Sequence, residues 1–262
     1  MRGFAVRLVA GVVGFGVAGV ALAAPMSERR VLACDDDNGW PPYTFRVPTA
    51  NGASEVRGRS VDLLRLALGR LGWTLELELL PWKRCLAEVA GGRYHLILSA
   101  TQTPERQRDY WVTAPYYKTQ QYYVWNRARW PDGPTVAKAA DFAQWRVGGV
   151  QGFVYPYLKA VGITPAVQAK SHTNLVDMLF AGRLDTVLIA DSILRSQRNR
   201  EGVLFWDDPN LGRAPVPGGY QNEYHMLISK RWPQGQELLQ DLQAELGRMR
   251  QRGELSLLMD GR

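Results

Sequence analysis

The sequence predicts an α/β protein in which helices cover parallel sheets, and two observations lead to this class. Short apolar runs alternate with amphipathic segments of helical length along most of the chain. Glycine or proline stands at the ends of several segments, where a helix or strand is expected to stop. Such alternation requires parallel strands, because each helix returns the chain to the same edge of the sheet.

The first half of the chain is expected to contain three strands and two helices. The strands are expected over residues 31–34, 74–80 and 94–98, and the helices over 60–71 and 82–90. Leucines recur at helical spacing in the first helix, which stops at Gly72, and the second ends at a glycine pair.

The second half repeats the alternation after a connector. A strand is expected over 120–125, and the proline- and alanine-rich segment 130–143 is the connector. The further strands are expected over 146–150, 186–189 and 224–229, and the further helices over 173–181 and 234–252.

A polar turn from Ser99 to Arg106 directly follows the apolar run 96–98. Thr103 suits the N-cap of a short helix, and Pro104 suits its first position, where no N–H is needed. The turn therefore brings hydroxyls and a guanidinium to the carboxyl end of a strand. These groups favour an anion site in which Arg106 binds a carboxylate through two hydrogen bonds. The alternative is a capped surface helix with a solvated arginine.

Residues 1–23 have the pattern of a secretory signal peptide. Arg2 and Arg7 flank the start of an apolar run, and Ala21-Leu22-Ala23 supplies small residues for cleavage after Ala23. The apolar run is shorter than the roughly 20 residues of a membrane-spanning helix, so an uncleaved anchor is the alternative. We therefore expect an exported protein.

The composition argues against two classes of partner. Apart from a short cluster at 195–200, the basic residues behind the net charge of +7 are scattered among acidic ones. A nucleic acid-binding surface needs a concentrated basic face, so we predict no nucleic-acid partner. His95, His172 and His225 lie far apart without the spacing of metal ligands, so we predict no metal site.

The chain contains two cysteines, Cys34 and Cys85. In an oxidising compartment an even number favours one disulfide. Both lie near strand ends that meet at one edge of the sheet if the strands are parallel neighbours. Two buried free thiols are the alternative.

Several motifs follow one another in order along the chain after the leader. They are Trp40-Pro-Pro-Tyr43, Gly58-Arg-Ser-Val-Asp-Leu-Leu64, Gly92-Arg-Tyr94, Thr103-Pro-Glu-Arg106, Ala114-Pro-Tyr-Tyr117, Val147-Gly-Gly-Val-Gln-Gly152, Ala181-Gly-Arg-Leu-Asp185 and the closing helix. With them the chain resembles the bacterial extracellular solute-binding proteins of family three, periplasmic receptors of polar amino-acid ABC transporters.

The resemblance implies a type II periplasmic-binding-protein fold, with two α/β lobes joined by two hinge strands. Lobe one is expected at 24–117 and 224–262, and lobe two at 118–223. A small-molecule ligand would be captured between the lobes by hinge closure. The resemblance also implies a periplasmic monomer without a cofactor that serves an ABC transporter permease.

The family's binding residues can be carried over to lobe one of this chain. The carboxylate-binding arginine falls on Arg106, and hydroxyl and backbone groups of the same turn fall on Ser99 and Thr101. The aromatic residue that stacks on the ligand falls on Trp40, and a ligand-facing acid falls on Asp37. Trp82 is expected to line the cleft as well. For both tryptophans, packing in a core is the alternative.

In lobe two the sequence departs from the family pattern. Phe153 and Tyr155 stand in a segment where other members have carboxylate-binding hydroxyls, and we expect both to contact the ligand. The acid that pairs with a ligand's α-amino group would fall on Ala190, with Asp191 one residue later. Either Asp191 reaches the cleft, or the ligand lacks an α-amino group.

Three functions compete at this stage. A binding receptor for an ABC importer is expected first, because every motif relates to ligand capture and none to catalysis. The second is a dehydratase of the cyclohexadienyl type, which needs a proton donor such as Glu223 or Asp191. The third is a partner that presents its ligand to a membrane sensor. We predict that the protein is not an enzyme.

Overall fold

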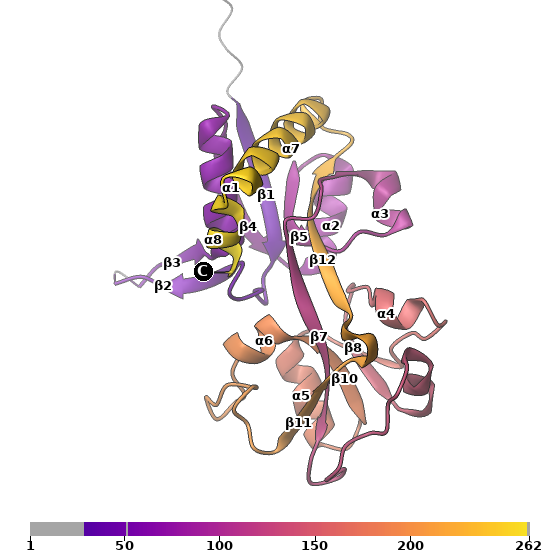
Figure 1. Ribbon diagram of the computed structural model, residues 1–262. Coiled ribbons are helices and arrows are strands. Elements are labelled where there is room, and N and C mark those ends of the chain that lie inside the picture. Colours follow the sequence, from indigo (N-terminus) through magenta and orange to yellow (C-terminus); the bar gives the residue numbers. More distant parts are fainter. Residues whose placement is uncertain (1–28, 51, 261–262) are drawn as a thin grey trace, which may run out of the picture.

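The computed structural model describes residues 29–50 and 52–260, and its elements form two groups, one above the other in Figure 1. The predicted signal peptide lies outside the described residues. We use the names lobe one and lobe two for the upper and the lower group. No helix within the described ranges is long and apolar enough to cross a membrane.

Lobe one contains three parallel strands in the order β4-β1-β5. The strands are β1 (Arg30–Asp36), β4 (Thr74–Leu80) and β5 (Leu96–Ala100), and the main helices are α1 (Arg59–Arg70), α2 (Trp82–Gly91), α7 (Gly235–Gln251) and α8 (Glu254–Asp260). Alternate residues of β1 enter different cores: Val31 and Ala33 share one with α1 and α7, and Cys34 shares another with α2. The sheet is therefore covered on both faces.

Lobe two contains a smaller parallel sheet with helices beside it. Its strands are β8 (Val147–Val150), β9 (Val167–Ala169) and β10 (Thr186–Ala190), and its helices are α4 (Pro156–Lys159), α5 (His172–Phe180) and α6 (Asp191–Ser196). Short 3-10 helices lie at Ala139–Gln144 and Pro217–Gly219. The strand β11 (Leu211–Pro215) pairs antiparallel with β7 (Tyr117–Asn126).

Two long strands, β7 (Tyr117–Asn126) and β12 (Gln221–Ser229), connect the lobes (Figure 1). They pair antiparallel from Tyr117↔Tyr224 to Gln120↔Gln221. β12 then pairs with β5 in lobe one, and β7 pairs with β10 in lobe two. A short helix, α3 (Pro104–Asp109), and a short strand, β6 (Tyr110–Val112), lie between β5 and β7.

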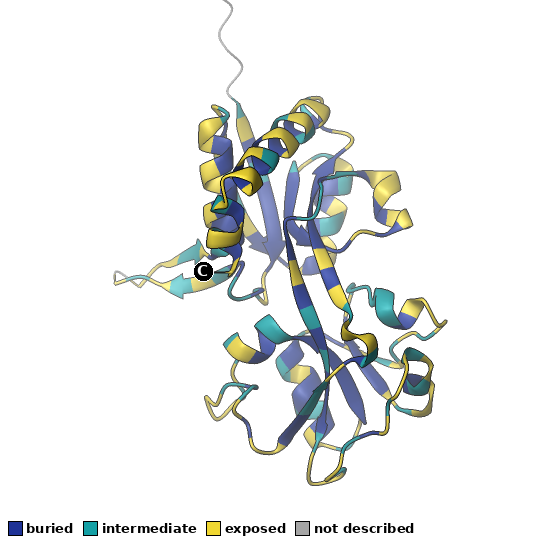
Figure 2. Cartoon of the chain, in the orientation of Figure 1, coloured by how far each residue is buried: buried dark blue, intermediate teal, exposed yellow. Residues whose placement is uncertain are grey.

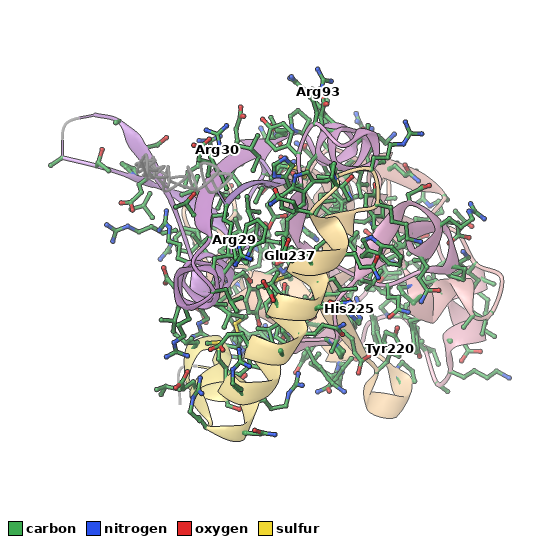
Figure 3. The ribbon with its side chains drawn as sticks, turned by 90° about the horizontal axis from the view of Figure 1, so that it is seen from above. Arg29, Arg30, Arg93, Tyr220, His225 and Glu237 are labelled. Atoms are coloured by element: carbon green, nitrogen blue, oxygen red, sulfur yellow. A yellow bond between two sulfur atoms is a disulfide. The ribbon has the colours of Figure 1, made fainter. Side chains whose placement is uncertain are left out.

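The inner strands β5, β8 and β10 are buried along their whole length, and the outer faces of the helices are exposed (Figure 2). The long helix α7, which precedes α8, also contacts the start of the described chain, because Arg29 Nη2 lies 2.6 Å from Glu237 Oε1 (Figure 3). The N-terminal and C-terminal parts of the chain therefore belong to the same lobe.

The predicted α/β class is confirmed, and the long elements lie where the sequence places them. The hairpin of β2 (Phe45–Pro48) and β3 (Ser54–Arg57) was not predicted. It projects from lobe one (Figure 1), and its residues are exposed or half-buried, so the segment lacks the apolar run that marks a core strand.

Candidate functional site

A cavity of about 50 Å³ lies between the lobes, at the carboxyl ends of their parallel strands. Its lining consists of Asp35, Asp36, Trp40, Trp82, Ser99, Ala100, Thr101, Arg106, Gln121, Phe153, Val154, Tyr155, His172, Leu188, Ala190, Asn222 and Tyr224. The edge formed by such strand ends is where ligands bind in open α/β sheets, because the connecting loops diverge there.

The lobes are in contact around this cavity. Trp82 Nε1 of lobe one donates a hydrogen bond to the Gly152 carbonyl of lobe two at 3.0 Å. Ser196 Oγ of lobe two donates to the Pro41 carbonyl at 3.0 Å. The two lobes are therefore closed on each other in this structure.

The turn after β5 has the predicted local structure. Thr103 is the N-cap of α3, its hydroxyl accepts a hydrogen bond from Arg106 N at 3.1 Å, and Pro104 occupies the first turn. The Arg106 side chain folds back over this turn, and its Nη1 donates to Thr101 O at 2.7 Å and to Thr101 Oγ1 at 2.9 Å. Its guanidinium also lies 5.5 Å from the centre of the Trp82 ring.

Arg106 is a buried charge, with 8% of its surface exposed. Burial lowers the pKa of its guanidinium to about 10, so the side chain remains charged at neutral pH. Within the described part of the chain no carboxylate forms an ion pair with it. An unpaired buried cation is costly, and an anion that entered the cavity would compensate it.

Two aspartates at the end of β1 form the acidic part of the lining. Asp35 Oδ1 accepts a hydrogen bond from Asp36 N at 2.9 Å, and Asp36 Oδ1 accepts from Asn38 N at 3.1 Å and Nδ2 at 3.0 Å. Thr44 lies beside Asp35, yet neither Thr44 Oγ1 nor Asp35 Oδ2 has a partner of hydrogen-bond geometry among the described residues. Burial raises the pKa of Asp35 to about 7 and that of Asp36 to about 6.

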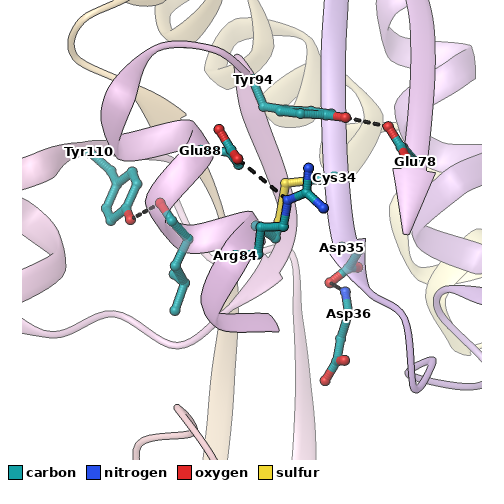
Figure 4. Close-up of a disulfide and its surroundings, with 10 residues drawn as sticks. Cys34, Asp35, Asp36, Glu78, Arg84, Glu88, Tyr94 and Tyr110 are labelled. Carbon is teal, nitrogen blue, oxygen red and sulfur yellow. Dashed lines mark hydrogen bonds and ion pairs between the residues drawn. A yellow bond between two sulfur atoms is a disulfide. The ribbon is translucent and has the colours of Figure 1, made fainter. Parts of the chain in front are cut away.

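A disulfide immediately precedes these acids. Cys34 of β1 is bonded to Cys85 of α2, with their Cα atoms 5.8 Å apart (Figure 4). The bond attaches α2, whose first residue Trp82 lines the cavity, to the strand that carries Asp35 and Asp36.

Aromatic rings from both lobes surround the polar groups. The Phe153 ring of lobe two lies 6.0 Å from both the Trp40 and the Trp82 rings, measured between ring centres. Trp40 Nε1 donates to the Tyr117 hydroxyl at 3.0 Å, which fixes the indole against the start of β7. The cavity therefore has flat apolar walls and a few polar groups, as is typical of small-molecule sites.

Lobe two supplies uncharged groups to the lining. The Tyr155 hydroxyl accepts a hydrogen bond from Val150 N at 2.7 Å, so its ring is fixed against β8. Burial lowers the pKa of His172 to about 4, so the imidazole is neutral at physiological pH.

Most of the residues expected at the site lie together. Trp40, Trp82, Ser99, Thr101, Arg106, Phe153 and Tyr155 all line the cavity. Ser99 Oγ, however, is already within 2.9 Å of the Tyr116 hydroxyl, which makes it part of the buried network below the cavity.

The two predicted acids, Asp37 and Asp191, are not in the lining. Asp37 is exposed, because β1 ends at Asp36 and the chain turns at the next residue. Asp191 begins α6, and its Oδ1 accepts a hydrogen bond from Ser192 N at 2.8 Å. The lining residue at this position is Ala190.

Glu223, considered as a proton donor, faces away from the cavity. Side chains alternate along β12, so Asn222 and Tyr224 line the cavity while Glu223 is exposed. Its carboxylate instead lies 2.7 Å from Lys118 Nζ.

Sequence reasoning missed several lining residues. Asp35 and Asp36 could have been considered, because they directly follow the strand expected over 31–34 and stand at the carboxyl end of β1, which belongs to the binding edge. Gln121, Asn222 and His172 carry no local signal, because the pairing of β7 with β12 and the approach of lobe two bring them to the cavity.

The chain forms two α/β lobes, which are joined by two strands and enclose a cavity. This architecture is typical of proteins that bind a ligand between their lobes. The profile of the bacterial extracellular solute-binding proteins, family 3, matches residues 32–260, and the chain belongs to this family. The comparison with curated proteins finds no match.

Several solved structures share this type II periplasmic-binding-protein fold. The amino acid ABC transporter substrate-binding protein AbpA from Streptococcus pneumoniae, bound to L-arginine, is 19% identical with a TM-score of 0.69, over 90% of this chain and 94% of that chain. A histidine kinase sensor domain is 21% identical with a TM-score of 0.70, over 89% and 96% of the two chains. An ancestral amino acid-binding protein, described as a precursor of cyclohexadienyl dehydratase, is 16% identical with a TM-score of 0.67, over 90% and 96%.

Proposed function

We propose that the protein is a periplasmic receptor that captures a small, carboxylate-bearing, amino acid-like ligand between its lobes for an ABC importer. The observation that carries the proposal is Arg106, a buried guanidinium that borders the cavity without an ion-pair partner among the described residues. A carboxylate is its natural complement, because it accepts two parallel hydrogen bonds from a guanidinium.

Capture would follow from closure of the two lobes about β7 and β12. A ligand bound to Arg106 in lobe one contacts Phe153 and Tyr155 of lobe two only when the lobes are closed. The closed state is then favoured by its higher affinity for the ligand, and few backbone angles need to change. The protein would act as a monomer and needs no cofactor for this task.

Two relatives in structure suggest what would receive the captured ligand. The S. pneumoniae protein is named as a substrate-binding protein of an ABC transporter, which supports a permease as the partner. The histidine kinase sensor domain supports a membrane sensor as the alternative receiver, and the same cavity would serve both.

Dehydration of a cyclohexadienyl substrate is a second candidate function, and one observation favours it. The pKa of Asp35 is raised to about 7, so its carboxyl group can be protonated at the edge of the cavity and donate a proton to a leaving hydroxyl. Incubation with prephenate and analysis of the products tests this activity. We expect the substrate to be recovered unchanged, and turnover that Asp35→Asn abolishes would favour the enzyme.

The receptor function is tested by identifying the bound molecule and by changing Arg106. Mass spectrometry of small molecules released from protein purified from its native compartment should detect a carboxylate. Arg106→Ala should weaken the binding of that carboxylate by roughly 2–5 kcal/mol in calorimetry, because it removes the partner of a buried charge.

The control is Arg108→Ala, which removes an exposed arginine from the same short helix. This variant should bind like the wild type. Equal affinity of the wild type and Arg106→Ala for the carboxylate would contradict the proposal.

A further inference from the structure

All charged side chains in the cavity lining belong to lobe one. They are Asp35 and Asp36 at the end of β1 and Arg106 in α3. Lobe two contributes Phe153, Val154, Tyr155, His172, Leu188 and Ala190, and the crossing strands contribute Gln121, Asn222 and Tyr224. Because burial keeps the His172 ring neutral, the charged partners for a ligand in this lining come from lobe one.

None of the three charged groups has a counter-ion within the part of the chain that the structure describes. Arg106 Nη1 donates to the neutral oxygens of Thr101, and Asp36 accepts from the backbone and amide of Asn38. Asp35 has one oxygen, Oδ2, that is buried without a hydrogen bond of normal geometry to a described residue. Buried charges of this kind are stabilised by a ligand group of opposite sign.

The positive and negative groups come from different elements and do not pair with each other. Arg106 belongs to α3, and Asp35 and Asp36 end β1. Within the described residues no ion pair joins Arg106 to either aspartate. The cavity therefore presents one unpaired cation and two acidic groups, all from the same lobe.

We propose that the ligand is a compact zwitterion whose two charged groups both bind to lobe one, the anion to Arg106 and the cation to Asp36 and Asp35. Lobe two then closes over the ligand with uncharged side chains. This inference rests on the proposed function and deepens it. The family resemblance implies an acid in lobe two as the partner of a ligand's α-amino group, but this chain has Ala190 at that position. We therefore place the cation site in lobe one.

Phe153 limits the size of the zwitterion. Its ring centre lies 6.0 Å from those of Trp40 and Trp82 and 5.8 Å from that of His172, so it stands between rings of both lobes. The remaining space of about 50 Å³ is small. A ligand with a long extension would have to displace this ring.

Calorimetry with a charge-matched series tests the inference. The zwitterions are glycine, β-alanine, α-aminobutyrate and γ-aminobutyrate, and the analogues with one charge are butyrate and butylamine. We expect at least one zwitterion to bind wild-type protein, and to bind at least about 30-fold more tightly than either analogue, because each charge has its own partner. Asp36→Asn should reduce the affinity for the zwitterion to that for butyrate and leave butyrate binding unchanged.

Asp132→Asn is the charge-matched control, since it removes an exposed carboxylate of lobe two that lies outside the cavity lining. It should not change either affinity. If Asp36→Asn does not fold, Asp35→Asn is measured in its place. The affinities of the zwitterions, butyrate and butylamine for the wild type then still test the inference. Butyrate that binds as tightly as its zwitterions, or a series in which no zwitterion binds, overturns the inference.

These outcomes are separable from failure of the proposed function. Equal binding of butyrate and the zwitterions would leave carboxylate capture by Arg106 intact and remove only the cation site. A carboxylate other than a zwitterion, recovered from the native protein and dependent on Arg106, would have the same consequence.

The size limit is tested with ε-aminocaproate, a zwitterion with a long extension. Phe153→Ala should bind it about tenfold more tightly than the wild type does. The control is Phe180→Ala, which replaces an exposed phenylalanine of the same lobe and should bind like the wild type. Unchanged affinity would contradict the size limit.

Discussion

Asp35 makes the stability of the folded protein depend on pH, because its carboxyl group is buried at the end of β1. Its pKa is about 7 in the folded protein and near 3.8 when solvated, so the folded state binds a proton more tightly than the unfolded state. The stabilising effect of this proton is complete below the solvated pKa and is lost as pH rises through the folded pKa. Near pH 8 the folded protein therefore contains an unfavourable buried charge.

Asp35→Asn should raise the melting temperature of the ligand-free protein at about pH 8 and raise it much less at about pH 5. The difference should amount to on the order of 2 to 3 kcal/mol in the free energy of unfolding. Asp36 titrates beside it, with a pKa of about 6, while burial keeps the Tyr116 hydroxyl protonated throughout this range.

The measurement is thermal unfolding at both pH values, with Asp132→Asn as the exposed control. The control should show the same pH profile as the wild type. An Asp35→Asn variant whose gain in stability does not depend on pH would show that this carboxyl group does not titrate in the folded state.

Among the elements, β1 and α2 are joined by the Cys34–Cys85 disulfide, which spans 51 residues of sequence. Both side chains are buried in the core that α2 shares with the sheet. Removing the bond with Cys34→Ala and Cys85→Ala should lower the free energy of unfolding by on the order of 4 kcal/mol, because the unfolded chain gains the freedom of an open loop. Denaturation in urea measures this loss.

Reductant should destabilise the wild type and leave the double variant unchanged. Titration of unfolded but unreduced wild-type protein should find no free thiol. Two reactive thiols per chain would show that the bond does not form in the purified protein.

For the whole molecule, we expect the proposed closure of the lobes to depend on the contact between Gly152 of lobe two and Trp82 of lobe one. Gly152 has a positive φ of 78°, and a Cβ added to it would lie 2.9 Å from Trp82 Cδ1 and 3.1 Å from Lys83 Cγ. Gly152→Ala should therefore hinder closure and weaken capture of the carboxylate recovered from the native protein by roughly 1–3 kcal/mol.

Gly162→Ala is the matched control. Gly162 lies in the same lobe and has a similar φ of 76°, but a Cβ added to it would meet nothing within 4 Å. Gly162→Ala therefore has the same backbone strain as Gly152→Ala without the contact with lobe one. In solution scattering with the ligand present, Gly152→Ala should have a larger radius of gyration than this control. Equal radii and equal affinities would show that the lobes do not need this contact.

The sequence by itself determined the long helices, the core strands and the turn that begins α3. The alternation of strands and helices follows from local periodicity, so α1, α2, α5 and α7 were found at nearly their observed positions. Arg106 was found for the same reason, since Thr103 and Pro104 begin α3 through contacts within a few residues. Trp40 was found through the family resemblance, and Phe153 through its place in a segment that departs from the family pattern.

Only the tertiary structure decided which acids reach the cavity. Asp37 was expected there, but β1 remains paired with β4 up to the contact of Asp36 with Leu80, so the sheet retains Asp35 and Asp36 and the chain turns at Asp37. Side chains alternate in direction along β12, so Asn222 lines the cavity while Glu223 is exposed. The register of β12 is set by its pairing with β7, which lies about a hundred residues earlier in the sequence. A shift of one residue along a strand reverses the direction of a side chain, and long-range strand pairing, which no local pattern encodes, sets that register.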